Sequence, residues 1–164
     1  MAIIQSNEIF FTAYEPKLTN RFIMRMVDTG IPSFLVKQVS AITLTQNAVP
    51  LNHINVQRYV KGKTIWNPIT FTMYESITPS GAQAVMEWVR LGHESVTGRD
   101  GYSDFYKRNL KFQGLGPVGD VVSEWVIQGA VITEANFGDY SWDDDGTPVN
   151  MTITVQPDYC ILNY

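Results

Sequence analysis

Charged side chains are scarce in this 164-residue sequence, which is 45% hydrophobic and 12% aromatic but only 17% charged. Soluble proteins are typically about 25% charged. The apolar content excludes a disordered or low-complexity chain, and the length is that of a single domain. Because an exposed surface normally carries charge, the shortage indicates that part of this surface is covered by something other than water.

Cysteine and long apolar runs are also nearly absent. Cys160 is the single cysteine, so an internal disulfide is excluded and nothing indicates an oxidising compartment. No run approaches the roughly 18 apolar residues of a membrane-spanning helix. Residues 1–16 contain Glu8 and Glu15 and lack a basic start followed by an apolar run, which argues against a signal peptide. We therefore expect a protein that is cytosolic where it is made.

Basic residues are missing from the last third of the chain. All 12 lysines and arginines lie at or before Lys111, where 8 acidic residues leave a balance of +4, whereas residues 112–164 hold 8 acidic residues and a balance of −8. Residues 29–74 show the opposite bias, with Lys37, Arg58, Lys61 and Lys63 but no carboxylate. Two explanations are open: chance with solvated loops, or oppositely charged surfaces through which copies of the chain stack. The acidic isoelectric point of about 5.1 disfavours a basic nucleic-acid binder.

Alternating apolar residues predict a mainly β fold. The predicted strands cover residues 21–28, 34–44, 56–60, 64–74, 105–113, 121–133 and 149–156. Residues 47–55, which include Pro50, are expected to be a polar connection, and residues 94–104 a long loop. The fold class that follows is a β-sandwich or small barrel of two antiparallel sheets with one flanking helix.

The helix is predicted over residues 79–92. Thr78 is suited to cap it, Pro79 suits its first position, and Gly92 lies where a glycine would end it. Ala82, Val85, Met86 and Val89 recur at helical spacing and give one apolar stripe. We therefore expect the helix to pack on a sheet.

Two predicted strands carry small uncharged polar residues on one face. These residues are Thr70 and Thr72 in the first strand and Thr152, Thr154 and Gln156 in the second. A solvated sheet face usually carries charge, which also blocks unwanted edge pairing. A face of threonine and glutamine is typical of the wall of a wet channel, so these five residues are our candidate lumen face.

The glycine-rich and acidic motifs do not predict a cofactor or metal site. Residues 114–119 have the spacing of a dinucleotide-binding glycine loop, but a β-branched segment follows where the helix N-terminus is needed. The run Asp143 to Gly146 lacks the glutamate that a calcium loop places six residues later, where Thr152 stands. Turns are the simpler interpretation of both motifs.

No catalytic arrangement stands out either. His53, His93 and Cys160 have no nucleophile or ligand pattern around them. Aromatic residues at 102–106 beside Lys107, Arg108 and Lys111 would suit a stacking nucleic-acid patch or a subunit contact, and the small number of charges favours the contact. We expect a protein that is not an enzyme and has no cofactor or bound metal.

In the order of its motifs, the chain resembles the tail tube proteins of contractile-tailed bacteriophages. The motifs are KLTNRF at 17–22, FLVKQV at 34–39, Trp66 followed by ITFTM at 69–73, EW at 87–88, YKR at 106–108, WVIQGA at 125–130, and WD at 142–143 with VQPDY at 155–159. The family usually has a Leu-Pro step after the second strand, where this chain has residues 41–44 and reaches Pro50 later. The resemblance covers about residues 17–160, so we predict an N-terminal arm at 1–16 and one tail-tube-like β domain at 17–164.

The resemblance implies a virion structural protein that assembles in the host cytoplasm. Its copies would form hexameric rings stacked into a tail tube, with a tape measure protein in the lumen and DNA passing through without specific binding. A sheath, a baseplate and a tail terminator would be its partners. The alternatives are a baseplate tube initiator, the tube of a secretion or injection system, and a stand-alone β-sandwich that binds a ligand.

The charge distribution predicts the contact between rings. We expect the basic stretch 46–63, with Arg58, Lys61 and Lys63, to meet an acidic surface on the adjacent ring formed by Asp139, Asp143, Asp144 and Asp145. The remaining carboxylates are expected to make the lumen acidic, so that DNA slides past without sticking.

Overall fold

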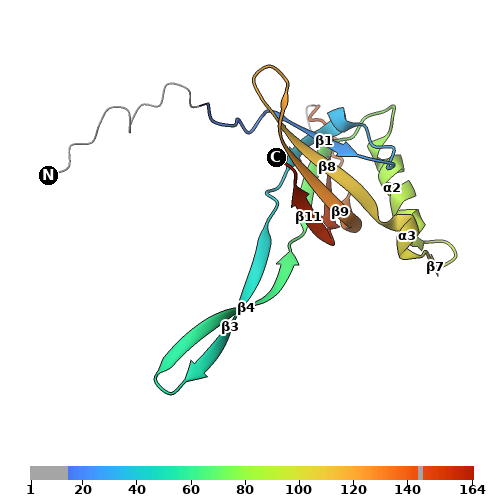
Figure 1. The fold of residues 1–164 in the computed structure, drawn as a ribbon. Helices are drawn as coiled ribbons and strands as arrows, with labels where there is room; N and C mark the ends of the chain where they lie inside the picture. Colours follow the sequence, from blue (N-terminus) through green and yellow to red (C-terminus); the bar gives the residue numbers. More distant parts are fainter. Residues whose placement is uncertain (1–14, 144–145) are drawn as a thin grey trace.

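The computed structural model describes residues 15–143 and 146–164, and it is mainly β (Figure 1). Its elements are β1 Phe22–Met26, the 3-10 turn η1 Ser33–Leu35, β2 Val36–Val39, β3 Leu44–His53, β4 Val56–Trp66, β5 Ile69–Tyr74, α2 Gly81–Gly92, β6 His93–Glu94, β7 Arg99–Asp100, α3 Ser103–Tyr106, β8 Arg108–Leu115, β9 Val121–Asn136, β10 Asn150–Gln156 and β11 Tyr159–Leu162. The predicted fold class is confirmed, with α2 as the flanking helix.

Seven strands form one antiparallel sheet. Six of them follow the order β1-β8-β9-β10-β5-β2, and the seventh, β11, pairs with β9 off that path. The long strand β9 belongs to two halves of this sheet. Its residues 121–130 pair with β8, whereas residues 131–136 pair with β10. The described strands fold over at β9 to give two facing layers, and they do not close into a barrel.

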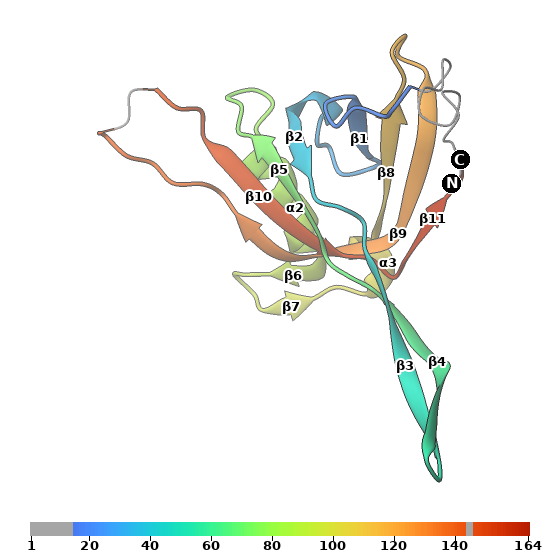
Figure 2. The same ribbon diagram turned by 90° about the vertical axis from the view of Figure 1, so that its left-hand side faces the viewer.

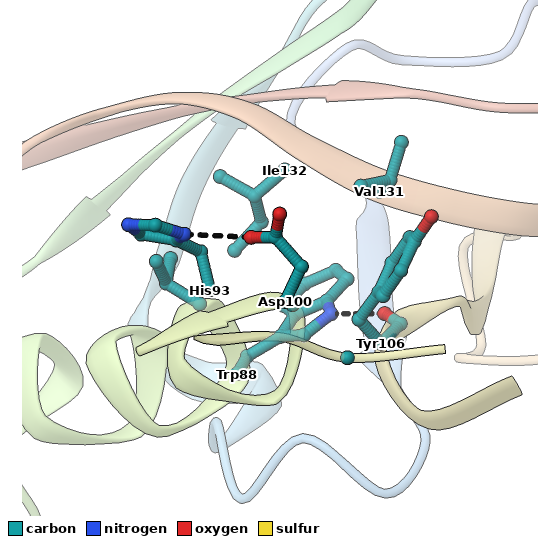
Figure 3. Close-up of a pocket in the computed structure, with 9 residues that line it drawn as sticks. Trp88, His93, Asp100, Tyr106, Val131 and Ile132 are labelled. Carbon is teal, nitrogen blue, oxygen red and sulfur yellow. Dashed lines mark hydrogen bonds and ion pairs between the residues drawn. The ribbon is translucent and has the colours of Figure 1, made fainter. Parts of the chain in front are cut away.

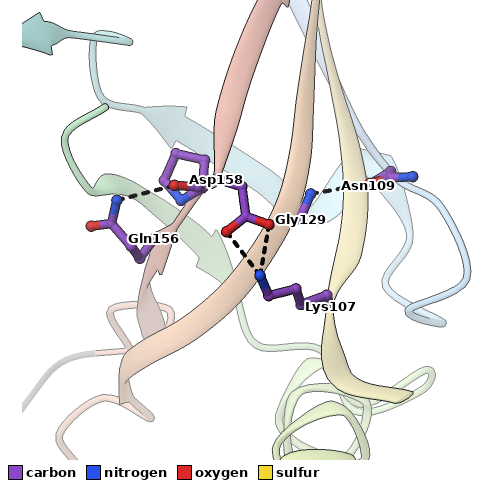
Figure 4. A network of polar contacts seen from close by, with 6 residues as sticks. Lys107, Asn109, Gly129, Gln156 and Asp158 are labelled. Atoms are coloured by element: carbon purple, nitrogen blue, oxygen red, sulfur yellow. Dashed lines mark hydrogen bonds and ion pairs between the residues drawn. The ribbon is translucent and has the colours of Figure 1, made fainter. Parts of the chain in front are cut away.

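A glycine allows β9 to bend between the two halves (Figure 4). Gly129 has a φ of +63°, and a Cβ there would lie 2.1 Å from Oδ2 of Asp158. That carboxylate accepts from Lys107 Nζ at 2.7 and 2.8 Å, while Gly129 N donates to Asn109 Oδ1 at 3.2 Å. The corner therefore ties the start of β8 and the β10–β11 turn to β9.

The core lies between the two halves and under α2. Cross-strand pairs put Met73 opposite Met151, Phe71 opposite Ile153 and Ile69 opposite Val155, and all six side chains are fully buried. Val85 and Trp88 of α2 are buried in the same cluster. The indole Nε1 of Trp88 also donates to the carbonyl of Tyr106 at 2.6 Å, which satisfies its polar group.

The helix begins two residues later than the sequence predicts. Ser80, rather than Thr78, is the N-cap: its hydroxyl accepts from Gln83 N at 3.3 Å. Glu75 accepts from Ala82 N at 2.9 Å and from the Ser80 hydroxyl at 2.8 Å. This carboxylate at the end of β5 decides where the helix starts, because it satisfies a free backbone donor of the first turn. Gly92 is the last helical residue, and His93 caps the end.

Two strand predictions and one predicted connection are wrong. Residues 34–44 are not one strand, because β2 covers only Val36–Val39 before the chain leaves the sheet. The predicted polar connection 47–55 lies mostly within β3, whose single pairing partner leaves one free edge where Pro50 is tolerated. Residues 64–74 are split by Asn67 and Pro68 into the end of β4 and all of β5.

The predicted loop 94–104 is also more ordered than expected. It contains most of the short hairpin β6–β7 and the start of α3, and α3 takes the first residues of the strand predicted from Phe105. The strand β9 runs three residues past its predicted end at Thr133, and β11 is an additional strand. None of the described helices is both long and apolar enough to cross a membrane.

Candidate functional site

The strands β3 and β4 form a long hairpin that projects away from the two-layered body (Figures 1 and 2). The two strands pair only with each other. Every residue of β3 is exposed, and in β4 only Gly62 and Trp66 are half-buried. Such a hairpin is marginally stable on its own, so its structure depends on how its base is held.

The base of the hairpin is fixed to the body by Trp66 and Asn67. The Trp66 ring packs edge-on against Trp125 of β9 with the ring centroids 6.5 Å apart, and the Trp66 carbonyl accepts from Gln156 Nε2 at 2.8 Å. The Asn67 amide donates to the hydroxyls of Thr43 and Thr45, each at 3.0 Å. These contacts clamp the strand entering the hairpin to the strand leaving it.

The outer half of the hairpin has two different faces. Cross-strand partners share a face, and the pairs Val49–Val60, Leu51–Arg58 and His53–Val56 alternate with Ala48–Lys61, Pro50–Tyr59 and Asn52–Gln57. We call the first set the apolar face and the second set the polar face. The four aliphatic side chains of the apolar face are 42–61% exposed.

The polar face is organised by side-chain hydrogen bonds. Gln57 Nε2 donates to Asn52 Oδ1 at 3.0 Å, and the Tyr59 hydroxyl donates to Gln57 Oε1 at 2.9 Å. The aliphatic residues of the apolar face are not covered by any part of the described chain, and each is exposed to solvent. The apolar face is therefore the side that gains from being covered.

The predicted basic residues lie on this hairpin, which contains no aspartate or glutamate. Arg58 lies on the apolar face, Lys61 on the polar face, and Lys63 beside the bulge where the register shifts. A Cβ at Gly62 would lie 2.9 Å from the Asn47 carbonyl oxygen, so glycine lets the strands come together at this bulge. The hairpin is a projecting surface of positive charge and exposed aliphatic groups.

The predicted acidic partners lie in the β9–β10 loop. Asp139 and Asp143 are both exposed there, whereas Asp144 and Asp145 lie outside the described residues. This loop extends from the body on the side away from the hairpin tip, so the two charged regions do not meet within one chain (Figure 2). Tyr140 and Trp142 in the same loop are 79% and 104% exposed.

The five residues of the candidate lumen face lie together, as the alternation predicts. Thr72 is opposite Thr152 and Thr70 is opposite Thr154, and the hydroxyls of Thr70 and Thr154 are 3.2 Å apart. The register extends this polar face over neighbouring strands to Gln38, Asn136 and Glu134, which the sequence reasoning missed. The result is a four-strand polar surface in which Glu134 is the one carboxylate of the register rows described.

The outer face of the other half-sheet has a different composition. Arg25 and Lys111 are cross-strand partners there, and Glu124 lies opposite Gln113. A hydrogen bond from Gln113, a second from Asn163 and the nearby Lys111 and Arg25 lower the pKa of Glu124 below its ordinary value. The backbone of Glu124 also pairs with Asn163 and Tyr164, so this residue holds the C-terminal end of the chain.

A cavity of about 430 Å³ lies beside the end of α2 (Figure 3). His93 Nδ1 and Asp100 Oδ1 are 2.7 Å apart on the exposed β6–β7 hairpin at its rim, and Val131 and Ile132 form part of the opposite wall. No serine, threonine, cysteine or lysine is among the residues that line it. Across residues 15–143 and 146–164, no group of three or more histidine, cysteine or acidic residues could hold a metal ion.

No known protein family matches the sequence, and no curated protein matches it. Solved structures do match the fold. A chain in the cryo-EM structure of the anti-feeding prophage cap, which terminates the tube, has a TM-score of 0.74 at 14% identity, with 94% of this chain and 95% of that chain covered. A chain in the sheath–tube complex of the extracellular contractile injection system PVC has a TM-score of 0.71 at 15% identity, with 98% and 99% covered.

Hcp1 from Flavobacterium johnsoniae is a more distant match, with a TM-score of 0.55 at 11% identity over 87% of this chain and 94% of that one. Likeness at these identities shows the fold, and the predicted tail-tube-like fold is confirmed. The matched chains of the prophage cap and of the PVC complex belong to tube assemblies.

Proposed function

We propose that this chain is the structural subunit of a bacteriophage tail tube, in which hexameric rings stack into a long tube. The lumen holds the tape measure protein and conducts DNA during ejection. The outside of the tube meets a tail sheath, and its ends meet baseplate and terminator proteins. The tube-like fold and the order of the sequence motifs both support this proposal.

The observation that carries the proposal is the separation of two complementary surfaces on one molecule. The hairpin bears Arg58, Lys61 and Lys63 without a carboxylate, and the loop with Asp139 and Asp143 extends from another side of the body. A contact between two different surfaces of identical subunits closes into a ring when the rotation closes and otherwise continues as a filament, as it does when rings stack along one axis. Complementary charge then fixes the register and orientation of successive rings.

The lateral contacts within a ring use the free edges of the sheet. The end strands β1 and β2 are each paired on one side only, and such edges invite pairing with another chain. Side-by-side pairing would join the sheets of a ring around the lumen. The face of Thr70, Thr72, Thr152, Thr154 and Gln156 then lines the lumen, where these five uncharged side chains give DNA phosphates no cation to bind. Lys37, whose ammonium lies 5.0 Å from the centre of the Tyr74 ring, is the cation beside this face among the described contacts.

A second candidate function is the tube or tube end of an extracellular injection system. The observation that favours it is that the matches to the anti-feeding prophage cap and to the PVC sheath–tube complex each cover at least 94% of this chain and of the matched chain. The subunit contacts proposed above are the same in either case. The two functions differ in what occupies the lumen.

The oligomeric state of the purified chain tests both functions. Size-exclusion chromatography and negative-stain electron microscopy should show rings or tubes in the wild type. Lys61→Glu combined with Lys63→Glu should prevent rings from stacking while the subunit stays folded, because both substitutions lie in the exposed hairpin. Lys17→Glu combined with Arg99→Glu changes the net charge equally outside the hairpin and is the matched control.

The outcomes separate the alternatives. Long tubes support the tube subunit, rings alone support a tube initiator or terminator, and a stable monomer would contradict the proposal in favour of a binding module. Tubes that form equally well with the Lys61 and Lys63 substitutions would contradict the charged contact between rings. Loss of tubes in the control pair as well would mean that net charge, rather than the hairpin, controls stacking.

A further inference from the structure

The turn at the tip of the hairpin has an unusual residue. Ile54 and Asn55 connect the closing pair His53 and Val56, and Ile54 has a φ of +37°. Turns of two residues with a positive φ at the first position normally have glycine there. A β-branched residue is strained in the left-handed region because its Cβ crowds the backbone.

Two other hairpin turns of the described chain have glycine at such a position, and the turn after β1 has Asp28 at a φ of +60°, a residue type that tolerates the left-handed region. Gly98 and Gly119 have φ values of +68° and +85° in the β6–β7 and β8–β9 turns, with open space around the position of a Cβ. The chain therefore supplies glycine at open left-handed positions, and Ile54 departs from that pattern. Ile54 is also 105% exposed, so no contact within the described chain compensates for its backbone strain or for the exposure of its side chain to water. Strain retained without a local reason points to a function.

We propose that Ile54 is an apolar anchor that inserts into a groove of a second copy, between α2 and the β9–β10 loop. This groove has a volume of about 490 Å³ and a wall made of Ala82, Met86, Phe137 and Tyr140, with Glu75 and Arg90 among its polar residues. The hairpin of the same chain points away from α2, so its own tip is not the occupant (Figure 1).

Charge complementarity between the hairpin and the β9–β10 loop supports this groove as the docking site. The loop that supplies Phe137 and Tyr140 also carries Asp139 and Asp143, and it has no basic residue. Arg58 is paired with Leu51 two cross-strand pairs from the turn, so docking of the tip brings this guanidinium toward those carboxylates. By contrast, the cavity between β2 and β8 is lined by Lys37 and has no carboxylate in its lining.

The inference rests on the proposed self-assembly, and substitutions at Ile54 test it separately. Ile54→Leu keeps an apolar anchor and should assemble like the wild type. Ile54→Gly relieves the left-handed strain, so the subunit should unfold at the same temperature or higher, yet the concentration needed for stacking should rise by about tenfold or more. Ile54→Asp should prevent stacking. If Ile54 is an anchor, these substitutions change the concentration needed for stacking without lowering the unfolding temperature. If Ile54 only forms the turn, relieving its strain should not weaken stacking.

Crosslinking tests the identity of the groove. Ile54→Cys combined with Gln83→Cys places one thiol at the tip and one in the lining of the groove. Oxidation of assembled protein with copper phenanthroline should link adjacent copies, whereas Ile54→Cys with Ser95→Cys, on the exposed β6–β7 hairpin, should not. Cys160 is buried and does not compete.

Each result has a defined meaning. Equal stacking of the wild type, Ile54→Gly and Ile54→Asp would overturn the anchor, and preferential linkage to the Ser95→Cys position would overturn the choice of groove. A wild-type chain that remains monomeric would overturn the proposed function, and this inference with it.

Discussion

Strands of the body and strands of the β3–β4 hairpin both alternate apolar and polar residues, but they differ in whether the apolar face is buried. In β5 and β10, every second residue is fully buried, and the apolar side chains are covered by α2 and by the facing half of the sheet. In β3 and β4, the apolar face of Val49, Leu51, Val56 and Val60 has the same alternation but no cover within the described chain. The difference indicates that the hairpin completes its burial only against another molecule.

As an energetic consequence, we expect the body to supply the free energy of folding and the hairpin to supply free energy of association. Burying a large aliphatic side chain contributes about 1.5–3 kcal/mol to stability. In the body, this burial occurs within one chain. The hairpin is held at its base by Trp66 and Asn67 and adds little to the free energy of unfolding of the isolated subunit. Its contribution is expected to appear in the free energy of association.

The largest expected effect compares one apolar residue from each region. Phe71→Ala removes a fully buried ring from the core and should lower the free energy of unfolding by about 3–5 kcal/mol, because it leaves a cavity. Leu51→Ala, at a residue that is 42% exposed, should change the free energy of unfolding of the monomer by less than about 0.5 kcal/mol. Urea denaturation under conditions that keep the protein monomeric measures both. A loss at Leu51 as large as that at Phe71 would contradict the comparison.

The same contrast explains which strands could be predicted from the sequence. Ile69 to Met73 and Met151 to Val155 alternate cleanly because one face is buried against a core, and both strands were predicted. In the hairpin, the strand predicted at 56–60 lies within β4, whereas β3 contains Asn47, Pro50 and Asn52, which are typical of loops, and was predicted as a connection. The strand structure of β3 comes from its pairing with β4, which residue preferences do not reveal.

The candidate site, like the strands, was predictable from the sequence only in part. Alternation placed Thr70 and Thr154 on one polar face, but their extension to Gln38 and Asn136 depends on which strands are neighbours. The charge bias identified the basic stretch, whereas its position on a projecting hairpin is a property of the fold. The left-handed φ of Ile54 had no sequence signal, because isoleucine is an unexpected residue in such a turn.

A smaller effect is expected at the corner of the body, with a hairpin turn as its control. Gly129→Ala puts a methyl group where the Asp158 carboxylate lies and also strains the φ of +63°. Gly98→Ala strains a similar φ of +68° in open space. The left-handed backbone should cost each variant about 1–2 kcal/mol, and displacement of the Lys107–Asp158 pair should make the loss at Gly129 the larger of the two. Thermal unfolding monitored by circular dichroism distinguishes them, and equal losses would mean that the corner tolerates a Cβ.

The smallest expected effect on stability is that of a cysteine substitution in the hairpin, whose thiol reactivity measures directly whether the apolar face is covered. Burial raises the pKa of Cys160 to about 11, so this thiol should react slowly with a maleimide in the folded protein at neutral pH. A Leu51→Cys variant places a second thiol on the exposed apolar face and should react rapidly in the monomer, with almost no change in the unfolding temperature. After assembly, the new thiol should become protected while Cys160 is unchanged, because the second copy covers the apolar face. Mass spectrometry of the labelled protein before and after assembly measures both sites. Rapid labelling at position 51 in assembled tubes would mean that the hairpin projects into solvent there as well, and that its aliphatic residues stack on nothing.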